Sequence, residues 1–159
     1  MTTLAVRAND FLAARRIALV GVSRDPRDMS RALFRELRQR GYDVVPVHPE
    51  VASVDGVPCA RKLQDVHPAV DGALLMTPPA ATERVVRDCA EAGVARVWMH
   101  RGAGRGAVSP AAVAFCRERG IAVVDGACPF MFLPDAGLVH RTHGFLARLF
   151  GRHPGSRAA

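Results

Sequence analysis

The chain has 159 residues, 49% of them hydrophobic, and a formal net charge of +7. This length allows one domain with a sizeable core but hardly two. No apolar run approaches the ~20 residues of a membrane-spanning helix, and residues 1–16 lack the apolar core of a secretory signal. We therefore expect a cytoplasmic protein without a membrane partner.

The basic residues are arginine at every position except Lys62. A basic chain can attract nucleic acid, but these arginines are spread along the sequence and aromatic residues make up only 6% of it. Neither a basic tract nor a base-stacking platform is evident, so nucleic acid is not the expected partner. The four cysteines form no Cys-x-x-Cys pair, which predicts reduced thiols and neither a zinc site nor a disulfide framework.

Short apolar runs alternate with helical patterns along the chain. Five runs are nearly continuous in apolar residues, as buried parallel strands are, and predict strands at 17–22, 43–48, 70–76, 95–99 and 121–125. Apolar residues at helical spacing predict helices at 29–40, 78–92 and 110–120, and short ones at 9–15 and 60–66. Thr77 and Ser109 each precede a proline, and we expect them to cap the two later long helices.

This alternation is typical of an α/β fold with a Rossmann-like, doubly wound parallel sheet in a single domain. We assign the domain to residues 1–150 and a flexible C-terminal tail to residues 151–159. The stretch 49–59 is too short for a full crossover and is expected to hold a degenerate third strand. The strand at 70–76 then crosses to the far side of the first strand, which puts a ligand-binding switch point beside residues 21–24.

The turn after the first strand reads GVSRDPRDMS, residues 21–30. It lies at a predicted helix N-terminus, where backbone N–H groups and the helix dipole favour an anion. It lacks the second and third glycines of a G-x-G-x-x-G dinucleotide loop, and its polar residues suit a ligand richer in phosphate. The expected contributors are the backbone of Gly21, the hydroxyls of Ser23 and Ser30, and the guanidinium groups of Arg24, Arg27 and Arg31, with Pro26 stiffening the turn.

The second predicted strand ends in His48 and Pro49. A site for NAD usually has an aspartate or glutamate there to bind the ribose hydroxyls, whereas Glu50 lies past the proline. A histidine tolerates a phosphorylated ribose better than a carboxylate would. Coenzyme A, which carries a 3′-phosphate and a pyrophosphate, fits this description as the cofactor and small-molecule ligand.

Five segments over roughly residues 15–130 resemble, in order, the small single-domain CoA-binding proteins of bacteria: IALVGVSRDPRDMSRALFRELRQRGYDVVPVHPE, DGVPC, VDGALLMTPP, GVARVWMHRGAG and GIAVVDGACPFMF. The same domain forms the nucleotide-binding part of the succinyl-CoA synthetase α subunit, and related domains in redox-sensing repressors bind NADH. This chain has no second domain with a phosphorylated histidine, so the resemblance does not carry synthetase chemistry over.

The resemblance also implies roles for particular residues. Four residues of the first loop, Gly21, Ser23, Arg24 and Pro26, would lie along the CoA phosphates. His48 and Pro49, where the family often has Asn-Pro, would flank the adenosine, and the opposite wall would be Thr77 and Pro78. His100 and Gly102 would border the pantetheine. With the cysteine discussed next, the expected cofactor-binding residues are Gly21, Val22, Ser23, Arg24, Pro26, Ser30, His48, Pro49, Thr77, Pro78, His100, Gly102 and Cys128.

Cys128 precedes Pro129 just after the last predicted strand. Its thiol could face the ligand and form a mixed disulfide with the CoA thiol, or it could be a buried packing residue. No nucleophile–base pair, acid–base pair or metal-ligand cluster is evident, so we expect neither catalytic nor metal-binding residues. Of the remaining histidines, His140 and His143 lie three residues apart, too few for a metal site.

The leading interpretation is therefore a protein that binds CoA or acyl-CoA as a carrier, sensor or partner module and is more a binding protein than an enzyme. Three alternatives stay open: an NAD(H)-binding redox sensor, an acyl-CoA-processing enzyme and a basic nucleic-acid-binding module. A protein partner or a homo-oligomer is compatible with the sequence.

Overall fold

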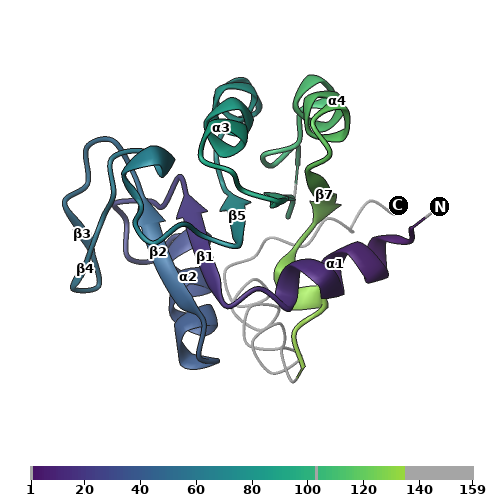
Figure 1. Ribbon diagram of the computed structural model, residues 1–159. Helices are drawn as coiled ribbons and strands as arrows, with labels where there is room; N and C mark the ends of the chain where they lie inside the picture. The colour runs from purple at the N-terminus through teal and green to yellow at the C-terminus, as the bar shows by residue number, and fades with distance from the viewer. Residues whose placement is uncertain (1, 103, 135–159) are drawn as a thin grey trace, which may run out of the picture. The chain divides into compact units, whose positions relative to one another are not determined.

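The computed structural model describes residues 2–102 and 104–134 (Figure 1). Contacts divide the chain into two units, Met1–Cys128 and Pro129–Ala159. The second unit contributes a single 3-10 turn, Pro129–Met131, to the described part. The predicted tail at 151–159, together with His140 and His143, lies outside the described residues. None of the helices in the described part of the chain has the length and hydropathy that a bilayer crossing requires.

The first unit is built on a five-stranded sheet in which every pairing is parallel. The strands are β1 Arg16–Val20, β2 Asp43–Val47, β5 Gly72–Leu75, β6 Arg96–His100 and β7 Ala122–Ala127, in the order β2-β1-β5-β6-β7. The helices are α1 Leu4–Leu12, α2 Met29–Gln39, α3 Pro79–Glu91 and α4 Pro110–Glu118, with a 3-10 turn at Leu63–Asp65. The predicted Rossmann-like parallel sheet is confirmed, as is the crossing of β5 to the far side of β1.

Helices cover both faces of this sheet, α3 and α4 one face and α1 and α2 the other (Figure 1). Alternate residues of β1 point to opposite faces, as in any strand: Ala18 and Val20 pack in the cluster that includes Val86 of α3. On the opposite face Phe11 of α1 meets Trp98 edge-on, with ring centroids 5.4 Å apart. Burial on both faces explains why the strand sequences are apolar throughout rather than alternating.

The stretch 49–59 does not form the degenerate third strand that we predicted in this sheet. Strands β3 Ser53–Val54 and β4 Val57–Pro58 instead pair antiparallel as a separate hairpin, and just beyond them Ala60 makes one parallel bridge to Val47 of β2. The turn residues Asp55 and Gly56 both have positive φ, 45° and 80°. An Asp-Gly pair between two valines is a strong signal for such a two-residue hairpin, and our interpretation of the sequence overlooked it.

Two predicted helix starts also differ from the structure. Helix α3 begins at Pro79, and the residue that caps it is Pro78, without a side-chain hydrogen bond. The hydroxyl of Thr77, the predicted cap, lies 2.7 Å from the hydroxyl of Thr82 instead. The short helix expected at 9–15 starts earlier, because Thr3 accepts a hydrogen bond from the N–H of Val6. The Ser109 cap is confirmed, since its hydroxyl accepts from the N–H of Ala112.

The first turn of the fold brings two backbone segments into contact. Gly21 has φ +89°, a conformation that side chains disfavour, and a Cβ there would lie 3.0 Å from the carbonyl carbon and oxygen of Met76 and 2.9 Å from Cγ2 of Thr77. Glycine therefore lets the chain leaving β1 pass directly against the chain leaving β5.

We predict that Gly21→Ala lowers the free energy of unfolding by about 2–4 kcal/mol, since backbone strain and overpacking act together. Gly120→Ala is the matched control, because Gly120 also has positive φ, +69°, but nothing lies within 4 Å of its Cβ position. It should lose only about 1–2 kcal/mol, from strain alone. Urea denaturation measures both values, and equal losses would contradict the close approach at Gly21.

Asp71 ties the start of β5 to the start of β1. Its Oδ2 accepts hydrogen bonds from the backbone N–H groups of Arg16, at 3.0 Å, and Arg15, at 3.1 Å. These bonds favour the carboxylate and lower the pKa of Asp71 below its ordinary value of 3.8. Because the folded-state pKa is the lower one, this contribution to stability is present above the ordinary value and is lost as pH falls through the lowered pKa.

We therefore predict that Asp71→Asn lowers the free energy of unfolding at pH 7 by about 1 kcal/mol, a value reduced by solvent screening. The difference from the wild type should shrink as pH falls toward 3, which denaturation curves recorded across this range will measure. Asp65→Asn is the control, since the Asp65 carboxylate has only a 3.9 Å contact with Lys62. If the difference in the free energy of unfolding between Asp71→Asn and the wild type did not change with pH, the charge of the carboxylate would be excluded as its cause.

Candidate functional site

A pocket of about 690 Å³ opens at the carboxyl ends of β1, β2 and β5, a volume typical of small-molecule sites. It lies where the order β2-β1-β5 places consecutive strands on opposite sides of β1, as predicted from the sequence. The loop after β1, the turn after β2, the segment before the 3-10 turn and the start of α3 form its walls. The lining residues are Val20 to Arg24, Val47 to Glu50, Arg61 to Leu63, Met76 to Pro78, Ala81, Arg84, Val85 and Asp88.

Eight of the residues predicted to bind a cofactor line this pocket together: Gly21, Val22, Ser23, Arg24, His48, Pro49, Thr77 and Pro78. Five others do not line it: Pro26, Ser30, His100, Gly102 and Cys128. The binding role of each residue remains a prediction, but the first group shares one cavity although its members come from three separate loops. Pro26 is exposed on the outer part of the first loop.

Ser30, His100 and Cys128 have buried positions away from this pocket. Ser30 is only 1% exposed, and its hydroxyl accepts from the N–H of Ser23 at 2.9 Å and donates to Asp28. His100 ends β6, and burial lowers the pKa of its ring. Cys128 follows β7 and is 8% exposed. From the sequence we expected the Ser30 hydroxyl to face the ligand. In the structure this hydroxyl instead bonds to the loop backbone at Ser23 and to Asp28.

The loop after β1 is held by its own side chains. Asp28 caps α2 by accepting from the N–H of Ser30 at 2.8 Å, so a carboxylate already occupies the helix end at which we expected a phosphate. Asp28 is a typical capping residue, and this signal was present in the sequence. No acceptor is found, among the described residues, for the backbone N–H groups of Val22 and Arg24, which remain as donors beside the cavity.

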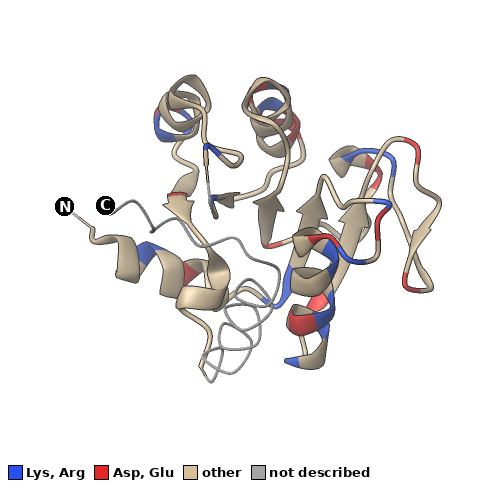
Figure 2. Ribbon diagram, turned by 180° about the vertical axis from the view of Figure 1, so that it is seen from behind, with Lys and Arg blue, Asp and Glu red and all other residues tan. Residues whose placement is uncertain are grey.

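The three arginines expected at the phosphates, two in this loop and one in the first turn of α2, each have a carboxylate partner. Arg31 pairs with Asp55 of the hairpin, and it donates to the carbonyl oxygens of Ser23, at 3.3 Å, and Arg24. Arg35 pairs with the same aspartate, and Figure 2 shows basic and acidic segments side by side on α2 and near the hairpin. Arg31 is thus a structural residue that fixes the loop backbone, contrary to its expected role at the ligand.

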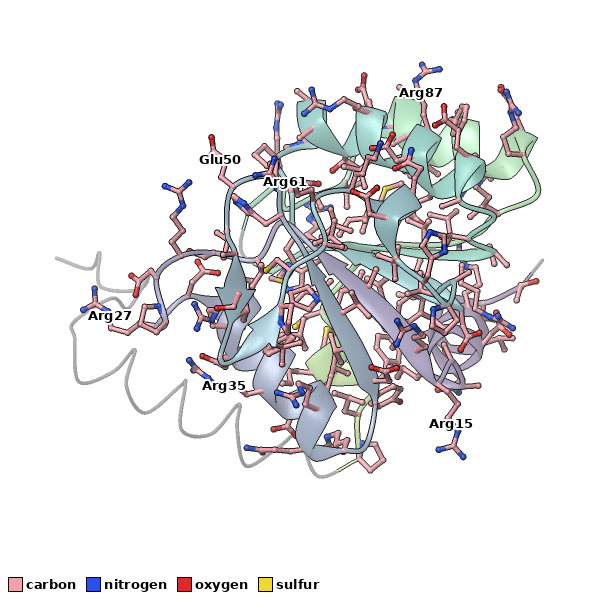
Figure 3. All side chains as sticks on the ribbon, turned by 60° about the vertical axis from the view of Figure 1, so that its left-hand side comes forward. Arg15, Arg27, Arg35, Glu50, Arg61 and Arg87 are labelled. Carbon is pink, nitrogen blue, oxygen red and sulfur yellow. The ribbon has the colours of Figure 1, made fainter. Side chains whose placement is uncertain are left out.

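The other two arginines differ in the reach of their ion pairs. Arg27 bonds to Asp25, which lowers the pKa of that carboxyl, and Figure 3 shows Arg27 pointing outward. Arg24 pairs with Glu50 across the pocket rim. Of the three, Arg24 alone lines the cavity.

Sequence reasoning missed the cations on the other wall. Arg61 and Arg84 line the cavity, and in the described part of the chain neither has a carboxylate partner. Their neighbour Lys62 has only a 3.9 Å contact, with Asp65. The basic Arg61-Lys62 pair is a local signal of surface exposure, but only the crossing of β5 brings it and α3 to one cavity.

His48 shapes the turn after β2 through its ring. Its Nδ1 accepts hydrogen bonds from the backbone N–H groups of Glu50, at 3.0 Å, and Val51, at 3.1 Å. Both bonds are made to the lone pair of Nδ1, so the ring orders the turn through its acceptor nitrogen. An asparagine at this position, as the resemblance would suggest, could accept the same two N–H groups through its amide oxygen.

The floor of the pocket is apolar, formed by residues such as Val20, Val47, Leu63 and Val85. In the described residues, no group of three His, Cys, Asp or Glu side chains could hold a metal ion. An apolar floor below a rim of guanidinium groups and free backbone N–H groups suits a ligand with a planar apolar part and attached phosphates.

Relatives of this chain include much longer enzymes. The α subunit of ADP-forming acetate–CoA ligase II from Pyrococcus furiosus is 30% identical over 85 residues, which are 53% of this chain and 19% of that protein. An ADP-forming acetate–CoA ligase from Methanocaldococcus jannaschii is 23% identical over 78 residues, 49% of this chain and 11% of that protein. The chain therefore spans less than a fifth of the length of these two relatives.

Solved structures share the fold at similar identity. A hypothetical protein from Pyrococcus horikoshii OT3 has a TM-score of 0.73 and 25% identity, and the match covers 80% of this chain and 87% of that one. Residues 15–134 also match the family described as the CoA binding domain, in agreement with the resemblance. Because this match takes in well over half of the 159 residues, the chain belongs to the CoA-binding domain family.

Proposed function

We propose that this protein binds coenzyme A in the pocket at the carboxyl ends of β1, β2 and β5. The observation that carries the proposal is a cavity lined by Arg61 and Arg84, which have no carboxylate partner within residues 2–102 and 104–134, in a chain of the CoA-binding domain family. The proposal concerns binding in the cytoplasm, as a carrier, sensor or partner module, and assigns no catalytic residue.

The charge distribution supports a ligand with several phosphates. Guanidinium groups bind phosphate through paired, charge-assisted hydrogen bonds. Among the described residues, the backbone N–H groups of Val22 and Arg24 lack an acceptor and add neutral donors around the same cavity. A 3′-phosphate and a pyrophosphate on one nucleotide would use donors on both walls of the pocket.

A specific observation keeps a dinucleotide as a second candidate. Glu50, which follows β2, lines the pocket, although from the sequence we had judged it remote because it lies past Pro49. In dinucleotide sites an acidic residue at this end of the second strand binds the ribose hydroxyls. Under this alternative the ligand is NAD(H), and the carboxylate of Glu50 contacts its ribose.

The two related ligases support the CoA assignment, since both are acetate–CoA ligases. We infer from them only the ligand class, because this chain spans 19% and 11% of their lengths. A protein partner that supplies chemistry to the bound ligand is consistent with this domain forming part of longer proteins.

Native mass spectrometry of the purified protein tests the ligand directly, and a CoA adduct is the expected result. Calorimetric titration should then give tighter binding for CoA than for dephospho-CoA, and the weakest binding for NAD. The reason is that each additional phosphate can form charge-assisted hydrogen bonds with a further guanidinium group of the pocket. Equal affinities for CoA and dephospho-CoA would show that the 3′-phosphate is not recognised. An NAD adduct would favour the second candidate.

Arg84 offers a matched test on one helix. We predict that Arg84→Ala weakens CoA binding by about 1–2 kcal/mol, or roughly 5- to 30-fold, through loss of a charge-assisted contact. Arg87→Ala removes the same charge one turn away, where the guanidinium stacks 5.2 Å from the Phe115 ring centroid and does not line the pocket. It should change affinity less than twofold, so equal losses would mean that only overall charge matters.

A further inference from the structure

The Arg24–Glu50 ion pair joins the two lips of the pocket. Arg24 follows β1 and Glu50 follows β2, and these strands are parallel neighbours. Both side chains line the cavity, and they are 65% and 70% exposed. Figure 3 shows Glu50 reaching outward, far from Arg15 at the other end of the sheet. A carboxylate therefore sits beside a cation that a phosphate in the pocket would meet.

We propose that Glu50 is a specificity-determining residue that competes with the ligand's phosphate for Arg24. Glu50 holds the guanidinium, and an incoming phosphate replaces the carboxylate as its partner. The inference rests on the proposed function, since it assumes that a phosphate-bearing ligand enters this pocket. It goes further in naming the Glu50 carboxylate as the group that lowers the affinity for such a ligand.

The pair has the properties that an exchangeable partner needs. Exposed ion pairs contribute little to stability, so breaking this one costs little, whereas a phosphate offers more charge and more acceptor oxygens than a carboxylate. The buried alternative on the same loop behaves differently: Arg31, whose side chain is 11% exposed, is held by Asp55 and by two loop carbonyls. Arg31 thus holds the loop backbone in place, whereas Arg24 can exchange its carboxylate partner for a phosphate.

Glu50 itself stays beside the ligand after the exchange. Its backbone N–H donates to Nδ1 of His48, which anchors the residue at the rim whatever its side chain does. The displaced carboxylate then repels the bound phosphate at short range. Glu50 should therefore reduce affinity most for the ligands that carry the most phosphate, and leave an uncharged nucleoside unaffected.

The test compares Glu50→Gln with the wild type by calorimetric titration of CoA, inorganic pyrophosphate and adenosine. Removing the competing charge should tighten CoA and pyrophosphate binding by about three- to tenfold and leave adenosine unchanged. In an Arg24→Ala background the gain from Glu50→Gln should shrink, because no shared guanidinium remains. Asp25→Asn is the control: its carboxylate pairs with Arg27 outside the pocket, so affinities should stay within twofold.

Each other result has a definite meaning. Unchanged or weaker phosphate binding by Glu50→Gln overturns the inference, and weaker binding of NAD by the same variant supports a ribose contact instead. If Asp25→Asn increased the affinity for CoA and pyrophosphate by the same factor, the change in net charge alone would explain the effect of Glu50→Gln. If the wild type binds pyrophosphate but not CoA, the proposed function fails while the competition at Arg24 is still measured.

Discussion

The pocket depends on the parallel pairing of β1 on both of its edges, with β2 on one side and β5 on the other. The chain leaves β1 through α2 toward β2, and later returns through the hairpin and the 3-10 turn to β5. Connections that leave one sheet edge in opposite directions cannot cover the strand between them, so a crevice remains above its carboxyl end. Gly21 lies at the bottom of this crevice because the β1 and β5 exits touch there.

Burial divides the charged groups of the first loop into two kinds. The Arg31–Asp55 pair is largely shielded, and removing one partner of such a pair would leave an uncompensated charge. Since Arg31 also holds two loop carbonyls, the hairpin and the loop backbone are fixed together. The exposed Arg24–Glu50 pair carries no such cost. A site with a preformed backbone and one adjustable cation loses little conformational freedom on binding.

The sequence predicted the parts of this fold that are set by local pattern. Runs such as Ile17 to Val20 are apolar on both faces and could only be buried strands, and their order with the helices specifies the sheet. The hairpin was missed although its Asp55-Gly56 turn is a recognisable sequence signal, because a third strand was expected from the fold class. Asp28 was also recognisable as the capping residue that takes the place of a phosphate at the N-terminus of α2. The pocket-lining cations Arg61 and Arg84 could not be predicted, since nothing in the local sequence distinguishes them from Arg87.

The contrast between Arg84 and Arg87 explains why the net charge of +7 says little about the pocket. The three arginines that follow β1, Arg24, Arg27 and Arg31, are balanced by Glu50, Asp25 and Asp55, so this segment contributes little uncompensated charge. The unbalanced guanidinium groups come from the opposite wall, on segments that meet only after β5 has crossed the sheet. A glycine-rich dinucleotide loop joins backbone donors and helix dipole in one segment. Here, within the described part of the chain, the first loop contributes two N–H groups without an acceptor, and the far wall contributes the guanidinium groups without a carboxylate partner.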